Sequence, residues 1–263
     1  MAWPSFLGFE TVDGFQDGPR GGVGEVGKGD AAMAHVLDIA DATRVYRVDD
    51  GAAVRALDGV SLRVTQGEFV CIVGQSGSGK STLLHCAGGL DSLTNGVVRV
   101  NGCDIAKMSE DDLRDLRHHR IGFLFQFFQL VSSLTAAENV CLGKLLDGIP
   151  LEASRDCVRT LLAKVGLSHR ASSRASTLSL GEMQRVAIAR SLMFDPMLVL
   201  ADEPTANLDV ATGGAVMRLL LQCTVEEGRT LLVVTNDPGV AEQADRVIEM
   251  SDGRIISVVP KSV

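Results

Sequence analysis

A glycine-rich stretch at residues 74–82 has the composition and spacing of a phosphate-binding loop. Gly74 to Ser81 reads Gly-Gln-Ser-Gly-Ser-Gly-Lys-Ser and fits the pattern GxxxxGK[ST] at every position. The Lys80 ammonium could reach the β- and γ-phosphates, and the Ser81 hydroxyl could bind Mg²⁺. Backbone N–H groups freed by the glycines, together with a helix beginning at Lys80, would wrap the polyphosphate. We predict that the nucleotide contacts Gly74, Gln75, Ser76, Gly77, Ser78, Gly79, Lys80, Ser81 and Thr82.

Two adjacent carboxylates supply the chemistry that such a loop lacks. Asp202 and Glu203 follow the apolar run Leu198–Ala201 directly. Asp202 could hold Mg²⁺ through water, and Glu203 could polarise a water that attacks the γ-phosphate. The alternative is an ordinary acidic strand end. The phosphate-binding loop in the same chain favours the metal and general-base interpretation.

The apolar runs predict the elements that must position these residues. Phe69–Val73 is a continuous apolar run next to Gly67 and Gly74, which is typical of a strand buried on both faces. A helix from Lys80 to Leu90 should follow the loop, and antiparallel strands between Val36 and Val64 should precede it. Further strands are expected at Met197–Ala201, Thr230–Thr235, Arg246–Met250 and Arg254–Val259, the last two joined as a hairpin by Asp252-Gly253.

This order of elements predicts an α/β domain with a helical subdomain inserted at about residues 125–180. The domain should span residues 33–263. Residues 1–32 read as a flexible leader, because eight of the first thirty residues are glycine and no hydrophobic period is visible. Met33 lies where the ordered pattern begins, so either the leader is a tail or translation starts at Met33.

Composition excludes several classes of protein. The formal net charge of −8 and the 4% aromatic content argue against a nucleic-acid partner. The six cysteines contain no CxxC, which argues against a zinc site or a disulfide framework. No apolar run approaches 18 residues, so a membrane partner would have to supply any membrane span.

Further motifs resemble the ABC-type ATPases. Leu178 to Arg185 reads Leu-Ser-Leu-Gly-Glu-Met-Gln-Arg and is similar to the LSGGQ signature of that family. Tyr46 resembles the residue that stacks on adenine, Gln126 resembles the Q-loop glutamine, and Ala206 to Asp209 resembles the D-loop. The resemblance covers about residues 36–258.

The resemblance implies a P-loop core with a mostly parallel sheet, an N-terminal antiparallel β-subdomain and an inserted helical subdomain. It implies ATP and Mg²⁺ as ligands, with Ser81, Gln126 and Asp202 on the metal side. A second ATPase protomer is implied, because Ser179, Gly181 and Glu182 would contact the partner's ATP. The remaining partner would be an integral-membrane permease that holds the chain at the cytoplasmic face of the cell membrane.

Three segments resemble one subgroup of the ABC-type ATPases in particular. IGFLFQFF, LTAAENV and ADEPTANLD resemble the ATPases of lipoprotein-release and macrolide-export type systems, whose relatives include the cell-division ABC ATPase. That group implies export or mechanotransmission through a permease.

Two residues depart from the family pattern. Leu180 stands at the third signature position, where the family has glycine, and would be strained if that position requires a positive φ. Asn236 in Val-Thr-Asn-Asp replaces the switch histidine. An amide can donate an N–H to a phosphate oxygen, but it can neither become cationic nor shuttle a proton. We therefore expect ATP binding to be intact, and hydrolysis to depend on Glu203, Gln126 and Asn236 and to be slowed.

Three classes of function remain open. The first is the ATPase subunit of a transporter, and the second is an ATP-binding regulator or asymmetric-heterodimer subunit with impaired hydrolysis. The third is a soluble ABC ATPase of translation or DNA repair. Those proteins usually carry two ATPase units, zinc modules or long coiled coils, none of which this sequence contains.

Overall fold

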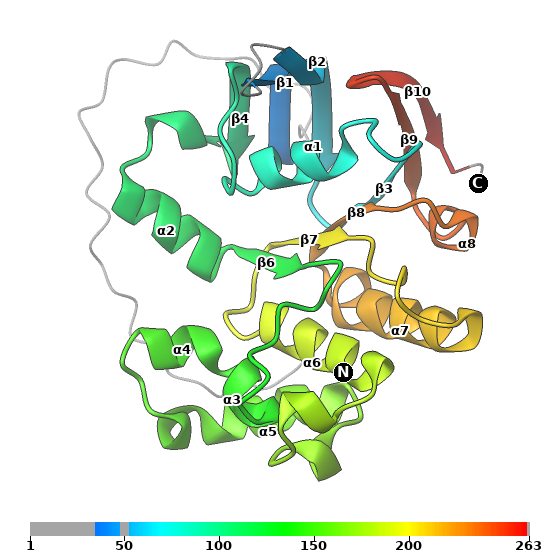
Figure 1. The fold of residues 1–263 in the computed structure, drawn as a ribbon. Helices are drawn as coiled ribbons and strands as arrows, with labels where there is room; N and C mark the ends of the chain where they lie inside the picture. The colour runs from blue at the N-terminus through cyan, green and yellow to red at the C-terminus, as the bar shows by residue number, and fades with distance from the viewer. Residues whose placement is uncertain (1–34, 48–52, 262–263) are drawn as a thin grey trace, which may run out of the picture. The chain divides into compact units, whose positions relative to one another are not determined.

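The computed structural model describes residues 35–47 and 53–261 as a mixed α/β structure with two sheets (Figure 1). The leader predicted at residues 1–32 lies outside the described residues. The first sheet is antiparallel and has the order β2-β1-β4-β5. Its strands are β1 (His35–Arg47), β2 (Ala53–Thr65), β4 (Asn95–Val100) and β5 (Cys103–Asp104).

The second sheet has the order β10-β9-β3-β8-β7-β6 and is parallel except for the β9–β10 hairpin. Its strands are β3 (Phe69–Val73), β6 (Ile121–Leu124), β7 (Leu198–Asp202), β8 (Thr230–Val234), β9 (Arg246–Ser251) and β10 (Arg254–Pro260). The predicted α/β class, the antiparallel N-terminal strands and the closing hairpin are therefore confirmed.

Both faces of the parallel sheet are buried, which explains the continuous apolar runs of its strands. In β3, Phe69 and Cys71 belong to one hydrophobic cluster, whereas Val70 and Ile72 belong to a second cluster on the opposite face. The helices α6 and α7 cover the first face, and α3 and α5 pack against α6. On the second face, α1 (Lys80–Ala87) packs between the two sheets (Figure 1). The buried sheet thus holds in place the strand ends from which the loops at its edge begin.

The helix predicted from Lys80 to Leu90 is shorter than expected. It ends at Ala87, because Gly88 and Gly89 follow and Gly89 has a φ of 65°. A Cβ at Gly88 would lie 2.3 Å from the Phe123 ring, so the chain needs a glycine to pass β6 at this point. The polar helix α2 (Glu110–His119) then leads to β6, with Ser109 as its N-cap.

Between β6 and β7 the chain forms a series of helices joined by loops. The α-helices there are α3 (Ala136–Val140), α4 (Leu142–Leu146), α5 (Arg155–Lys164) and α6 (Leu180–Ser191). After β7 come α7 (Val210–Cys223) and α8 (Pro238–Ala241). None of the helices in the described part of the chain has the length and apolar character needed to cross a bilayer.

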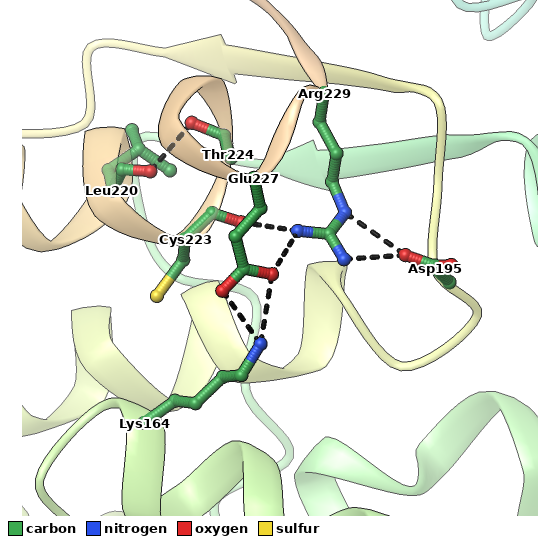
Figure 2. A network of polar contacts seen from close by, with 7 residues as sticks. All are labelled: Lys164, Asp195, Leu220, Cys223, Thr224, Glu227 and Arg229. Atoms are coloured by element: carbon green, nitrogen blue, oxygen red, sulfur yellow. Dashed lines mark hydrogen bonds and ion pairs between the residues drawn. The ribbon is translucent and has the colours of Figure 1, made fainter. Parts of the chain in front are cut away.

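A polar network connects the end of α5 to the segment between α7 and β8 (Figure 2). Lys164 donates to both carboxylate oxygens of Glu227, at 2.8 and 2.9 Å. Arg229 donates to Glu227 at 2.7 Å, to the Cys223 carbonyl at 2.8 Å and to Asp195. Glu227 therefore joins a cation from the helical segment to one that directly precedes β8.

Replacing Glu227 by Gln should destabilise the fold by about 0.5–1 kcal/mol at neutral pH, because two cations lose their shared, solvent-screened carboxylate. Burial alone would raise the pKa of Glu227, but hydrogen bonds from Lys164 and Arg229 hold it below its ordinary value. A carboxyl with a lowered pKa stabilises the fold above its unfolded-chain pKa and loses that contribution as the pH falls through the folded pKa.

Urea unfolding of the two proteins between pH 7 and pH 4 measures this effect. The difference between native and Glu227→Gln should shrink toward pH 4. Glu226→Gln, at an exposed neighbouring carboxylate, is the matched control and should unfold like the native chain. An equal and pH-independent loss in both variants would show that the network does not carry the effect.

Candidate functional site

Four adjacent strands of the parallel sheet end at one edge, and the predicted site residues follow them there. The strand order β3-β8-β7-β6 places the phosphate-binding loop after β3 and Thr235-Asn236 after β8. Asp202 ends β7, and Gln126 lies two residues beyond β6. Open α/β sheets bind ligands at the carboxyl ends of their strands. The topology therefore brings together residues that the sequence spreads over more than 160 positions.

The loop after β3 is closely built around the Lys80 side chain. The Lys80 ammonium donates to the carbonyls of Gly74 at 2.6 Å and Gln75 at 3.0 Å, and the residue is 6% exposed. Gly79 has a φ of 99°, and a Cβ there would lie 2.2 Å from the Ala56 carbonyl oxygen. A Cβ at Gly74 would meet the Met250 carbonyl as closely. The loop therefore requires its glycines, and it holds a cation at the start of α1, where a polyphosphate fits.

Asp202 and Ser81 meet where the sequence predicts a magnesium ion. The Ser81 hydroxyl donates to Asp202 Oδ1 at 3.0 Å, and His85 Nε2 lies 3.9 Å from Asp202 Oδ2. Burial raises the pKa of Asp202, and the hydrogen bond from Ser81 opposes that rise. Carboxylate and hydroxyl oxygens are ligands that Mg²⁺ prefers, so this pair fits a magnesium ion. Gln126 is exposed at the same edge of the sheet. Its backbone carbonyl accepts a hydrogen bond from Asn207 Nδ2 at 2.6 Å.

Glu203 is fixed in an uncommon conformation at the end of β7. Its φ is 45°, and its N–H donates to the Val234 carbonyl at 2.9 Å. Its Oε2 accepts from Thr235 Oγ1 at 3.0 Å and from the Asn236 N–H at 3.3 Å. The carboxylate is thus tied to the loop after β8 by Thr235, a fully buried residue. Sequence reasoning did not select Thr235, although a polar residue directly after the apolar run of β8 is a detectable signal.

Tyr46 lies at the end of β1 and is 37% exposed. Its hydroxyl donates to Asp91 Oδ2 at 2.6 Å. The Arg44 guanidinium lies 4.6 Å from the centre of the Tyr46 ring and also forms an ion pair with Asp91. One cation and one carboxylate therefore support this ring, and neither was predicted.

The signature residues begin α6. The Ser179 hydroxyl accepts from the Glu182 N–H at 3.3 Å, and the Glu182 carboxylate accepts from the Ser179 N–H at 2.8 Å, which makes a capping box. Arg170 pairs with Glu182 at 3.0 Å. The Glu182 carboxylate is therefore engaged within its own helix end.

The strain expected at Leu180 is absent. Leu180 is the first residue of α6 and does not have a positive φ, so a leucine satisfies this position. Its side chain is 50% exposed.

Ser179, Leu180 and Gly181 line a hollow of about 930 Å³ together with Asn207, Asp209 and Thr212. In the described part of the chain, no residue of the loop at 74–82 lines this hollow. Within one chain, the signature residues and the phosphate-binding loop therefore do not line the same hollow.

The family described as ABC transporter matches residues 57–206, which is more than half of the chain. The chain belongs to the ABC transporter family. The matched residues include the loop at 74–82, the Asp202-Glu203 pair and the start of α6. The ABC fold expected from the resemblance is confirmed as well.

Two ABC relatives confirm the expected subgroup. The lipoprotein-releasing system ATP-binding protein LolD 1 of Rhodopseudomonas palustris is 43% identical over 224 residues, covering 85% of this chain and 99% of that protein. The macrolide export ATP-binding/permease protein MacB of Chlorobaculum tepidum is 44% identical over 221 residues, covering 84% of this chain. This chain spans 34% of the length of that MacB protein.

A solved ABC structure with a similar fold shows two cassettes together. The dimeric post-hydrolysis structure of the ATP-binding cassette MJ0796, bound to ADP and Pi, superposes with a TM-score of 0.79 at 37% identity. The match covers 86% of this chain and 100% of that one.

Proposed function

We propose that this chain is the ATP-binding and ATP-hydrolysing subunit of an ABC transporter, coupled to a separate membrane permease. The observation that carries the proposal is the convergence of Lys80, the Ser81–Asp202 pair and Glu203 at one edge of the parallel sheet. A triphosphate site, a metal site and a general base are what hydrolysis of ATP requires.

Residues 74–82 would bind the phosphates of ATP, and Tyr46 would stack on the adenine. Ser81 and Asp202 would hold Mg²⁺, with Gln126 approaching from the loop after β6. When bound, Mg²⁺ neutralises charge that develops on the phosphate oxygens. Glu203 would take a proton from the attacking water, and the Thr235 hydroxyl keeps that carboxylate in place.

A second protomer completes the site in this proposal. Ser179 and Gly181 open onto the hollow beside α6, away from the phosphate-binding loop of their own chain. They would contact ATP held by the loop of the other protomer, and the helix N-terminus would supply N–H groups to the phosphates. The dimer of MJ0796 supports this arrangement.

ATP with Mg²⁺ should therefore drive the full chain from one copy to two, which light scattering on a size-exclusion column measures. Without nucleotide, the mass should be that of one copy. Leu180→Glu is the matched variant: its side chain is half exposed and an acid suits the first turn of a helix, so the fold is preserved. The new carboxylate repels the partner's triphosphate, so this variant should bind ATP and fail to pair. ATP-dependent pairing that survives in Leu180→Glu would refute the signature contact.

Relatives favour a transporter over other uses of an ABC ATPase. LolD is named as part of a lipoprotein-releasing system, and MacB is named as an export ATP-binding/permease protein. By analogy, the permease would hold this chain at the cytoplasmic face of the membrane, and coupling would be of the export or mechanotransmission type.

Asn236 favours a second candidate function. Its side chain is an amide where the family pattern has a histidine, and its backbone N–H already contacts Glu203. An amide cannot carry the positive charge or the proton of an imidazole. The alternative is therefore an ATP-gated regulator, or one half of an asymmetric heterodimer whose other half hydrolyses ATP.

Tyr46→Ala should weaken ATP binding about 5- to 30-fold, because stacking on an aromatic ring contributes roughly 1–2 kcal/mol per base. Tyr46→Phe keeps the ring and loses only the hydrogen bond to Asp91, so its affinity should stay within about threefold of native. Calorimetric titration with ATP measures both variants. Equal affinities in Tyr46→Ala and native chains would show that the adenine binds elsewhere.

A further inference from the structure

The loop that follows Gln126 contains two consecutive residues in the left-handed region. Phe128 has a φ of 58° and Gln129 a φ of 50°. Non-glycine residues adopt this region uncommonly, and a bulky residue such as phenylalanine does so rarely. Phe128 is buried in the same hydrophobic cluster as Phe69 and Cys71 of β3, whereas Gln129 is exposed. This strained turn begins two residues after the glutamine proposed to act at the metal site.

Arg190, near the end of α6, holds this turn. Its Nη2 donates to the Phe128 carbonyl at 2.6 Å, and its Nη1 donates to the Gln129 carbonyl. Burial lowers the pKa of the Arg190 guanidinium. In residues 35–47 and 53–261, no carboxylate forms an ion pair with it. A half-buried guanidinium is usually paired with an acid, so here the two backbone carbonyls take that place.

The same helix reaches the other loops of the site. Gln184 is 1% exposed, and its Nε2 donates to the carbonyl of Pro204, the residue after Glu203. Asn207 Nδ2 donates to the Gln126 carbonyl at 2.6 Å. The helix that begins with the signature residues therefore contacts the loop after the general base and the loop after Gln126.

We propose that Arg190 is a positioning residue: it clamps the Phe128–Gln129 turn and thereby holds Gln126 at the nucleotide site. The inference deepens the proposed function and rests on it for the role of Gln126. The clamp itself is a property of the chain without nucleotide. The two hydrogen bonds from Arg190 make the strained turn the dominant conformation, and the backbone between β6 and the turn, which includes Gln126, is thereby held in one conformation.

Amide hydrogen exchange of residues 125–131, without nucleotide, tests the clamp directly. Arg190→Met removes both donors and should speed exchange in this loop by about tenfold or more. Gln129→Gly added to Arg190→Met should slow exchange again, because glycine adopts the left-handed region without support. A packing role of Arg190 alone would not be rescued by a glycine at an exposed loop position.

Mg²⁺-dependent hydrolysis provides the second readout. Arg190→Met should lower the maximal rate about tenfold and raise the Mg²⁺ concentration for half-maximal rate, and Gln129→Gly should restore both. Gln129→Val leaves α6 intact and disfavours the left-handed turn, so it should reproduce the defect even if Arg190→Met fails to fold. Gln129→Gly alone should behave like the native chain.

The outcomes separate the two proposals. Unchanged exchange in both Arg190→Met and Gln129→Val would overturn the clamp, as would a folded Arg190→Met that glycine does not rescue. Changed exchange with rescue, in a chain that binds no ATP, would support the clamp and refute the proposed function instead.

Discussion

Lys80→Met is expected to weaken ATP binding by about 100-fold or more, which corresponds to about 2.7 kcal/mol. The Lys80 ammonium is almost fully buried and is held by the carbonyls of Gly74 and Gln75. A triphosphate entering the loop would exchange those carbonyls for phosphate oxygens, which are stronger partners for a cation. Methionine fills the same volume but leaves the phosphates without their countercharge. Calorimetric titration of the full chain with ATP and Mg²⁺ measures the loss.

Lys107→Met is the control for this experiment. Lys107 has a largely exposed side chain at the end of a short 3₁₀ turn and pairs with Asp104. Its replacement should leave the affinity for ATP unchanged. An affinity of Lys80→Met within about threefold of native would mean that the loop does not bind the triphosphate.

Glu203→Gln should lower ATP hydrolysis by about 10²- to 10⁴-fold while ATP binding stays close to native. The amide keeps the shape of the side chain but cannot accept a proton from water. Its carbonyl oxygen can still accept from Thr235 Oγ1, so the loop after β7 should keep its conformation. Steady-state phosphate release measures the rate, and titration with ATP confirms that the site still binds. Glu242→Gln, at an exposed carboxylate, should have no effect on either quantity.

Thr235→Val tests whether the hydrogen bond from Thr235 to the Glu203 carboxylate contributes to the rate of hydrolysis. The Glu203 carboxylate would lose one of its two donors and keep the Asn236 N–H. Hydrolysis should fall about tenfold, less than in Glu203→Gln, because the base remains but is less well oriented. A Glu203→Gln chain that hydrolyses ATP as fast as a clearly active native chain would assign the base to another residue.

The strands that carry the site were predictable because their sequences are unambiguous. A sheet buried on both faces leaves continuous apolar runs, and the residues proposed to bind phosphate and metal and to act as the base lie at the ends of these runs. Parallel strands end at a common edge, so the neighbourhood of Lys80, Asp202 and Glu203 follows from the class of fold.

The supporting residues were not predictable in the same way. Asp91 lies 45 positions from Tyr46, and Arg190 lies 62 positions from Phe128, so no local pattern connects either pair. The contacts of Asp91 and Arg190 are formed by tertiary packing between separate elements. The capping box between Ser179 and Glu182, by contrast, is a local pattern that the sequence itself contains.

The account depends most on one comparison of steady-state ATP hydrolysis: the native full chain against Asn236→His, with Glu203→Gln as the blank. We predict that the native chain turns over slowly but above the blank, and that histidine raises the rate by about tenfold or more, because it restores a group that can carry charge and a proton. A native rate equal to the blank would favour the hydrolysis-impaired alternative. A rapid native rate that histidine leaves unchanged would contradict the role assigned to Asn236.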